Sequence, residues 1–216
     1  MKLPKSILIK ETKTLFAGKY NYKIVLVCPA AGWFRSKNYD FTRSKLDEVE
    51  PHHYHDKWFR IKNDEDLNYC YKVLDVLEKF NDTEYDIRIE SPLISIYTNN
   101  KIYIEQLAGI DKETIKFVSL PAKNIQRLDP GKVVVKTLDY DYKVYLATIK
   151  NKDHSSFLNW TKDNNKIRIT KRCIKDLNQR ISWGGSYFYV KDAKTLTMVK
   201  MFLGTDISRV EQVIKG

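Results

Sequence analysis

The sequence predicts an α+β fold built from two related halves. Each half has the outline ββαβαβ, with a mainly antiparallel sheet and helices on one sheet face. Two observations lead to this prediction. Several segments combine alternating strand residues with a capping residue and a helix-spaced apolar stripe. The order of these segments starts again after residue 127, which divides the chain into halves 1–127 and 128–216. The alternative is one continuous domain.

The segment Ser186–Gly204 shows the pattern most clearly. It begins with a predicted strand, YFYV, in which Phe188 and Val190 share one face and Tyr187 and Tyr189 the other. Asp192 stands at the N-cap position of a helix that Gly204 ends. The helix must bury its apolar stripe against the sheet, so the more apolar pair, Phe188 and Val190, is predicted to lie in the core.

The N-terminal half contains the same kinds of segment. We expect a β-hairpin over Ser6–Val27, then a helix, a strand, a second helix, two strands, a third helix and a strand. Their predicted ranges are Phe41–Val49, Trp58–Ile61, Asp64–Phe80, Tyr85–Ile89, Leu93–Tyr97, Lys101–Ala108 and Ile115–Leu120. The buried stripe of the second helix is predicted to be Leu67, Cys70, Tyr71, Leu74 and Leu77.

A segment rich in proline and glycine, Pro121–Lys132, is the predicted linker. A second hairpin follows it, and then a helix, a strand, two further helices around the strand Tyr187–Val190, and a closing strand. The predicted ranges are Val133–Ile149, Ser155–Asp163, Ile167–Thr170, Lys171–Gln179, Ala193–Leu203 and Ser208–Ile214.

Three matches in the same order indicate an internal duplication. KTL at Lys13 matches KTL at Lys136, and YNYKIVL at Tyr20 matches YDYKVYL at Tyr140. WFRIKN, which begins at Trp58, matches YFYVKD; Ile94–Gly109 is a looser copy of the same strand–cap–helix pattern. Hairpins and capped helices also resemble one another without common ancestry, and this remains the alternative.

Composition limits the class of protein. The hydrophobic fraction of 43% and the charged fraction of 30% are typical of soluble globular domains. We find no apolar run long enough to span a bilayer and no secretory signal. Three widely spaced cysteines indicate reduced thiols and a cytoplasmic protein. The lysine-, asparagine- and isoleucine-rich composition is typical of AT-rich genomes and is compatible with a phage or viral source, hence the host cytoplasm.

The net charge of +11 is unevenly distributed. Residues 128–216 contain 17 basic and 9 acidic residues, whereas residues 1–127 contain 21 and 18. This asymmetry indicates a polyanionic partner for the C-terminal half. The alternative is a lysine-rich surface that serves solubility alone.

Gly184–Val190, GGSYFYV, is similar to the RNA-recognition-motif signature, in which a glycine precedes a strand of alternating aromatic residues. The resemblance implies ferredoxin/RRM-like halves and implies that Tyr187 and Tyr189 stack on bases. No basic residue directly precedes the glycines, however, and a second aromatic motif is not evident. The alternative is a strand whose two tyrosines are merely half-exposed.

The densest basic stretch of the chain lies just before this segment. Cations bind phosphates and aromatic rings stack on unpaired bases, so the combination suits single-stranded nucleic acid. The candidate binding residues are Trp160, Lys166, Arg168, Lys171, Arg172, Lys175, Arg180, Trp183, Tyr187 and Tyr189. A solvated basic helix face is the alternative interpretation of this stretch.

The sequence His52-His53-Tyr54-His55 is a candidate metal site. On a strand, His53 and His55 would share one face, similar to the His-hydrophobic-His pair with which replication-initiator and relaxase nucleases hold a metal. Tyr71 and Lys72 would supply the helix residues of that resemblance. No acidic third ligand and no cysteine partners at zinc-finger spacing are present. A polar loop is the alternative.

The sequence therefore favours a binding protein over an enzyme: an accessory protein that binds single-stranded RNA or DNA and needs no cofactor. Two other hypotheses stay open, a structural or assembly subunit that binds other protein chains, and a metal-dependent nuclease that uses His52–His55. The common nucleotide-binding and hydrolase motifs are absent from the sequence.

Overall fold

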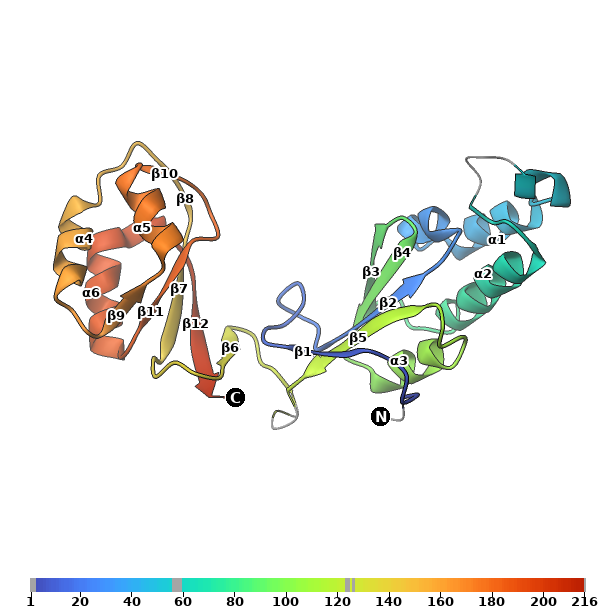
Figure 1. Cartoon of the computed structure of the whole chain (residues 1–216), viewed down its shortest axis with the longest axis horizontal. Coiled ribbons are helices and arrows are strands. Elements are labelled where there is room, and N and C mark those ends of the chain that lie inside the picture. The colour runs from blue at the N-terminus through green and yellow to red at the C-terminus, as the bar shows by residue number, and fades with distance from the viewer. Residues whose placement is uncertain (1–2, 56–59, 123–124, 126, 216) are drawn as a thin grey trace. The chain divides into compact units, whose positions relative to one another are not determined.

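A computed structural model describes residues 3–55, 60–122, 125 and 127–215 of the chain. The chain divides into two compact units, Met1–Arg127 and Leu128–Gly216, called here the N-terminal unit and the C-terminal unit. Each is a mixed α+β unit with its own five-stranded sheet (Figure 1). No helix in the described part of the chain is both long and apolar enough to cross a bilayer.

The N-terminal unit alternates strands with helices. In chain order it contains β1 (Ile9–Thr12), β2 (Tyr22–Val27), the 3-10 helix η1 (Ala31–Ser36), α1 (Tyr39–Asp47), the 3-10 helix η2 (Pro51–His55), α2 (Asp64–Leu77), β3 (Tyr85–Glu90), β4 (Leu93–Thr98), α3 (Lys101–Ala108) and β5 (Ile115–Pro121). The predicted strand Trp58–Ile61 begins outside the described residues, and Arg60 and Ile61 are in no strand.

The C-terminal unit has a similar order of elements. It contains β6 (Lys132–Val135), β7 (Tyr142–Leu146), β8 (Thr148–Lys150), α4 (Ser155–Lys162), β9 (Ile167–Ile169), α5 (Lys171–Asn178), β10 (Ile181–Trp183), β11 (Tyr187–Val190), α6 (Ala193–Leu203), the 3-10 helix η3 (Gly204–Asp206) and β12 (Ile207–Lys215). Strands β8 and β10 form a separate two-stranded antiparallel ladder.

The two five-stranded sheets have the same strand order and directions. The order is β1-β5-β2-β4-β3 in the N-terminal unit and β6-β12-β7-β11-β9 in the C-terminal unit. In each, the first strand pairs in parallel with the last, and every other pair is antiparallel. These five-stranded orders differ from the four-stranded order of a ferredoxin-like sheet, and the predicted outline ββαβαβ omits one strand of each.

Both predicted hairpins, Ser6–Val27 and Val133–Ile149, are wrong in their pairing. Strand β5 lies between β1 and β2, and β12 lies between β6 and β7. Around Gly18 only an isolated bridge joins Phe16 to Tyr20. Alternating side chains identify a strand and its faces, but they carry no information about which other strand completes its hydrogen bonds.

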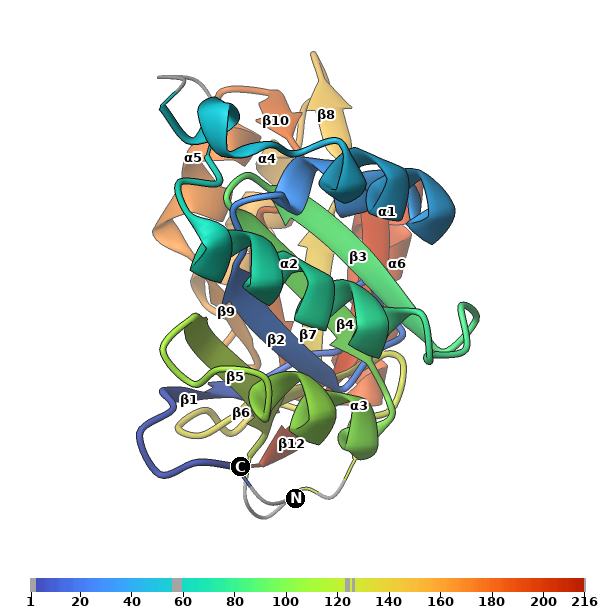
Figure 2. The ribbon, with the colours of Figure 1, turned by 90° about the vertical axis from the view of Figure 1, so that its right-hand side faces the viewer.

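Each sheet is covered by helices on one face. The N-terminal core joins β2, β4 and β5 to helices α1, α2 and α3, and Figure 2 shows α2 and α3 in front of the sheet. The C-terminal core joins β7, β9 and β11 to α4, α5 and α6. The buried stripe of α2 differs in part from the prediction, since Tyr69 and Val73 are buried while Leu67 and Tyr71 are only partly covered.

Helix caps account for several element boundaries. The side chain of Asp192 accepts a hydrogen bond from Thr195 N, so this predicted cap is confirmed. For the helix that begins at Lys101 the sequence leaves Asn99 and Asn100 as cap candidates, and Asn100 is the cap, since it accepts a hydrogen bond from Ile102 N. Asn38 caps α1 in the same way, which moves that helix two residues ahead of its predicted start at Phe41.

The sheet register also shows which helices hold equivalent places. Tyr22 pairs with Thr98, and Tyr142 pairs with Val190. Two residues after Thr98 and Val190 come Asn100 and Asp192, the caps of α3 and α6. Helix α3 connects β4 to β5, and α6 connects β11 to β12. Strand order thus matches α6 with α3, the looser of the two sequence copies, and not with α2, to which the WFRIKN alignment had matched it.

Candidate functional site

The C-terminal sheet exposes the face that its helices leave uncovered. Along β11, Phe188 and Val190 are fully buried in the core, whereas Tyr187 and Tyr189 are half-buried on the opposite face. The predicted division of this strand into a core face and an open face is therefore confirmed. Neighbouring strands determine what else lies on the open face.

Strand β7 adds further residues to this face. Tyr145 is paired with Tyr187, and Lys143 with Tyr189. The ring centroids of Tyr145 and Tyr187 are 5.7 Å apart, those of Tyr187 and Tyr189 also 5.7 Å, and those of Tyr140 and Tyr189 6.1 Å. We call Tyr140, Tyr145, Tyr187 and Tyr189 the tyrosine face. Three of its residues lie on the neighbouring strands β7 and β11, and Tyr140 precedes β7.

Tyr145 and Tyr140 were not among the predicted site residues. The signal for Tyr145 was present in YDYKVYL, where it alternates with Lys143 on a strand whose Val144 and Leu146 are apolar. Only the pairing of β7 with β11 shows that this alternation continues the aromatic pattern of Tyr187 and Tyr189.

Two cations lie over the rings of the tyrosine face. Lys143 Nζ lies 3.9 Å from the ring centroid of Tyr187 and 4.6 Å from that of Tyr145. The guanidinium carbon of Arg209, on β12, lies 4.0 Å from the Tyr145 centroid. Both contacts are within cation–π range. Burial raises the pKa of Tyr189 although Lys143 opposes the shift, so this hydroxyl stays protonated at neutral pH.

One acidic residue lies on the same face. Glu211 on β12 is paired with Lys143, and its Oε1 is 3.3 Å from Arg209 Nε. The residue is only 8% exposed, and its Oε2 makes no hydrogen bond within the described part of the chain. A buried carboxylate oxygen without a donor is unusual in a folded protein, because such groups normally find a partner.

The predicted basic stretch is divided between two surfaces. Arg168 on β9 is paired with Tyr189 and is exposed at the edge of the tyrosine face. Lys171, Arg172 and Lys175 lie on the exposed side of α5, in the helix layer that covers the other face of the sheet.

The two remaining cations of the stretch form ion pairs. Lys166 Nζ is 2.9 Å from a carboxylate oxygen of Asp192, and Arg180 is 3.1 Å from one of Asp153. Pairs this exposed contribute little to stability, but they reduce the net positive charge that these residues present.

The two predicted tryptophans also lie apart. Trp160 on α4 stacks on Phe202 of α6 with a centroid distance of 4.9 Å, so it belongs to the helix layer. Trp183 on β10 is 86% exposed. Trp183 pairs with Thr148, and Ile149, the next residue along β8, is in the core. Because side chains alternate along a strand, Thr148 and Trp183 point away from the core.

The histidine cluster does not have the predicted geometry. Residues 51–55 form a 3-10 helix that starts at Pro51, and side chains two residues apart on such a helix point in different directions. His53 Nδ1 accepts a hydrogen bond from Glu50 N at 3.0 Å, and His52 Nδ1 is 3.1 Å from Glu50 Oε2. The side chain of His55 is outside the described residues, among which no group of three or more metal-ligating side chains occurs.

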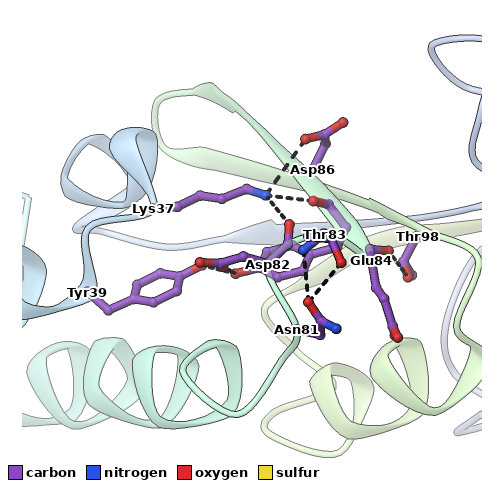
Figure 3. Close-up of polar contacts among 9 residues, drawn as sticks. Lys37, Tyr39, Asn81, Asp82, Thr83, Glu84, Asp86 and Thr98 are labelled. Atoms are coloured by element: carbon purple, nitrogen blue, oxygen red, sulfur yellow. Dashed lines mark hydrogen bonds and ion pairs between the residues drawn. The ribbon is translucent and has the colours of Figure 1, made fainter.

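A separate polar cluster in the N-terminal unit surrounds Lys37 (Figure 3). Lys37 Nζ donates to the backbone oxygens of Asp82 and Tyr85 at 3.1 and 2.6 Å, and lies 3.7 Å from Asp86 Oδ1. The hydroxyls of Tyr39 and Tyr85 are hydrogen-bonded to each other.

Burial raises the pKa of Tyr39 to about 12 and that of Tyr85 still further. Neither hydroxyl can act as a base at neutral pH. We therefore interpret the Lys37 cluster as a brace that ties the segment between η1 and α1 to β3.

Comparison with known proteins assigns no family to this chain: no protein-family model, no curated protein and no solved structure matches it.

Proposed function

We propose that the protein binds single-stranded nucleic acid on the tyrosine face of its C-terminal sheet. The observation that carries this proposal is the grouping of four tyrosines and two cations on the uncovered side of β7, β11 and β12 and in the segment before β7. Half-exposed rings on an open sheet face suit flat ligands, because successive bases can stack on them whatever their sequence.

Electrostatics supports the same ligand. Lys143 and Arg209 lie among the rings, Arg168 lies at the edge, and the surrounding unit carries most of the net positive charge of the chain. A single strand presents its bases and its phosphates together, so rings and cations at one surface suit it better than duplex, whose bases are stacked inside. We leave RNA and DNA as one ligand class.

The proposal extends to the relation between the halves. In each unit the four antiparallel strands, β5-β2-β4-β3 and β12-β7-β11-β9, follow the order of a ferredoxin-like βαββαβ core. We infer that each unit is such a core to which β1 or β6 has been added in parallel, with α5 and the ladder of β8 and β10 as insertions in the C-terminal unit, and that the two arose by duplication. The equivalent positions of Lys23 and Lys143, each paired with a tyrosine, support this inference.

The test is a binding titration of the full-length chain with a fluorescent single-stranded oligonucleotide at several salt concentrations. We expect binding that weakens steeply with salt and is lost in the double variant Tyr145→Ala/Tyr187→Ala. Phe41→Ala, which removes an exposed ring from the N-terminal unit, is the matched control. Salt-insensitive binding, or full affinity in the double variant, would contradict the proposal.

A second candidate function is that of an assembly subunit that binds other protein chains. It is favoured by α6, where Met198, Met201 and Phe202 are exposed on the helix layer, away from the tyrosine face. Exposed apolar groups of this kind often mark protein contacts. Loss of self-association or partner binding in Met201→Ser, with oligonucleotide binding unchanged, would favour this second function.

A further inference from the structure

The guanidinium group of Arg209 lies over a ring of the tyrosine face, where a bound base would lie. This group is planar and lies 4.0 Å above the centroid of Tyr145. The same group directs Nε toward Glu211, 3.3 Å from Oε1. A flat, N–H-bearing group thus lies over a tyrosine ring and close to a carboxylate. The Arg209 side chain is 61% exposed, so it can leave the Tyr145 ring without displacing the core.

Glu211 has acceptor capacity that Arg209 leaves unused. An ionised carboxylate accepts through two oxygens, yet Oε2 makes no hydrogen bond within the described residues although it is buried. Lys143 is the cross-strand neighbour of Glu211, but its Nζ lies over the rings of Tyr187 and Tyr145. The open face therefore contains one carboxylate oxygen that would gain from a donor supplied by a ligand.

The register places Tyr145 and Glu211 at a suitable spacing. Tyr145 pairs with Arg209, and Glu211 lies two residues further along β12 on the same face. Such diagonal neighbours are about 7–8 Å apart. A base centred on the Tyr145 ring would reach roughly this far with its Watson–Crick edge, provided that it takes the place of the Arg209 guanidinium.

We propose that Tyr145 and Glu211 form a guanine-selective base site, occupied in the free protein by Arg209. This inference rests on the proposed function and names the base that the tyrosine face selects. Upon binding, Arg209 moves from the ring to a phosphate, and the base stacks in its place. No covalent chemistry is involved.

Guanine is selected because of the donors on its edge. Its N1–H and N2–H are adjacent and parallel, so they match the two oxygens of one carboxylate. Cytosine and adenine present one amino group beside a ring-nitrogen acceptor, which the carboxylate would repel. Uracil and thymine present one N–H between two carbonyl oxygens. Of the four kinds of base, guanine alone satisfies both Oε1 and Oε2 of Glu211.

The test measures the affinity of the full-length protein for short oligouridine strands that contain one central guanosine, cytidine or adenosine, beside the unsubstituted strand. The same series in deoxyribose form, on a thymidine background, distinguishes RNA from DNA. We expect the guanosine strand to bind about tenfold more tightly than the unsubstituted one, which is the usual discrimination of one bidentate contact.

Two variants assign the preference to Glu211. Glu211→Gln keeps the shape but replaces one acceptor by a donor, and Glu211→Ser introduces the residue found at the equivalent Ser119. In both, the guanosine preference should fall to about onefold while affinity for oligouridine stays equal or rises, because a negative charge is removed. Asp163→Asn, which removes an equal charge at the end of α4, should preserve the preference.

The outcomes separate the two proposals. If all four strands bind equally, the guanine site is wrong and the proposed function stands. If the guanosine preference survives in both Glu211 variants, the assignment to this carboxylate is wrong. If no strand binds at all, the proposed function itself fails. Circular dichroism and thermal melting of each variant establish that a lost preference is not lost folding.

Discussion

The faces of the two sheets that lie opposite their helices have the same framework and different surfaces. In each, the second residue of a central strand is a lysine paired with a tyrosine: Lys23 with Tyr97 in the N-terminal unit, and Lys143 with Tyr189 in the C-terminal unit. Both lysines lie within cation–π range of that tyrosine, at 5.2 and 6.0 Å. The lysine–tyrosine pair of this row is therefore common to the two faces.

The next row separates them. Where the C-terminal sheet pairs Tyr145 with Tyr187, the N-terminal sheet pairs Val25 with Ser95, both of which are buried. In this row the N-terminal face has one ring, that of Phe117 on β5, in place of the two tyrosine rings. The difference teaches that a shared fold does not make a shared site, because the ligand meets individual side chains.

Charge widens the contrast at the sheet edges. On the edge strand of the C-terminal sheet, Arg168 pairs with Tyr189. On the edge strand of the N-terminal sheet, Asp86 pairs with Tyr97. Lys10 and Lys23 do lie near the Phe117 ring, at 3.8 and 5.5 Å, so the N-terminal face is not without cations. We nonetheless expect nucleic acid to bind the C-terminal face, and four comparisons of variants test this contrast.

The largest effect is expected in the core behind the tyrosines. Phe188→Ala empties a fully buried site and should reduce the free energy of unfolding by about 3–5 kcal/mol. Tyr187→Ala, on the open side of the same strand, should cost less than about 1 kcal/mol. Chemical denaturation of both variants measures the difference. Equal losses would mean that both faces of β11 are buried and that the C-terminal sheet has no open face.

A smaller effect is expected on binding. Tyr189→Ala should weaken binding of a single-stranded oligonucleotide by about 1–3 kcal/mol, because a stacked base loses its ring. Tyr97→Ala removes the equivalent ring from the N-terminal face and should leave the affinity unchanged. Anisotropy titrations of the two variants, side by side, decide the matter. Equal losses would show that both faces bind, and the contrast between them would be wrong.

The equivalent lysines should differ in their effect on salt dependence. Lys143→Ala should lower the slope of log affinity against log salt by about one, as expected when one phosphate contact is lost. Lys23→Ala should leave that slope as it is. The measurement is the same titration repeated over a range of salt concentrations. A slope lowered only in Lys23→Ala would move the phosphate path to the N-terminal unit.

The smallest effect concerns the caps of the equivalent helices. The hydrogen bond from Thr195 N and the nearby Lys166 lower the pKa of Asp192 to about 2. Its charge therefore stabilises the C-terminal unit above the ordinary carboxyl pKa, and this contribution is lost as the pH falls toward 2.

Asn100, the neutral cap of α3, has no such dependence, so Asp192→Asn should lose most of it. The urea midpoints of wild type and Asp192→Asn should differ at pH 5 and converge near pH 2. A difference independent of pH would show that the charge of Asp192 has no role in the cap.

Local signals in the sequence identified most of the helices and strands, but not β10 or the 3-10 helices. The predicted helix Lys101–Ala108 has the observed bounds of α3, and alternation placed Phe188 in the core. Strand pairing could not be predicted from local patterns. Strands β5 and β12 come much later in the chain, and each lies between two strands that the sequence had suggested as a hairpin. The metal hypothesis for His52–His55 required a strand, but Pro51 begins a 3-10 turn instead.

The candidate site divided along the same line. Tyr187 and Tyr189 lie on one strand, so alternation alone was enough to find them. Tyr145, Arg209 and Glu211 joined the site only through cross-strand register, which no local pattern encodes. Conversely, Trp160 is near Lys166 in sequence but belongs to the helix layer.

The parallel pairing of first and last strands has a consequence for synthesis on the ribosome. Ile9 finds its partner only when Val118 has been made, and Lys132 must await Gln212. Until then the earliest strand of each unit has no place in its sheet, although all the turns and helices between can already form. Contacts this distant along the chain slow folding. We therefore expect the sheet of each unit to be completed in one late step, when its last strand emerges and pairs with the two strands on either side of it.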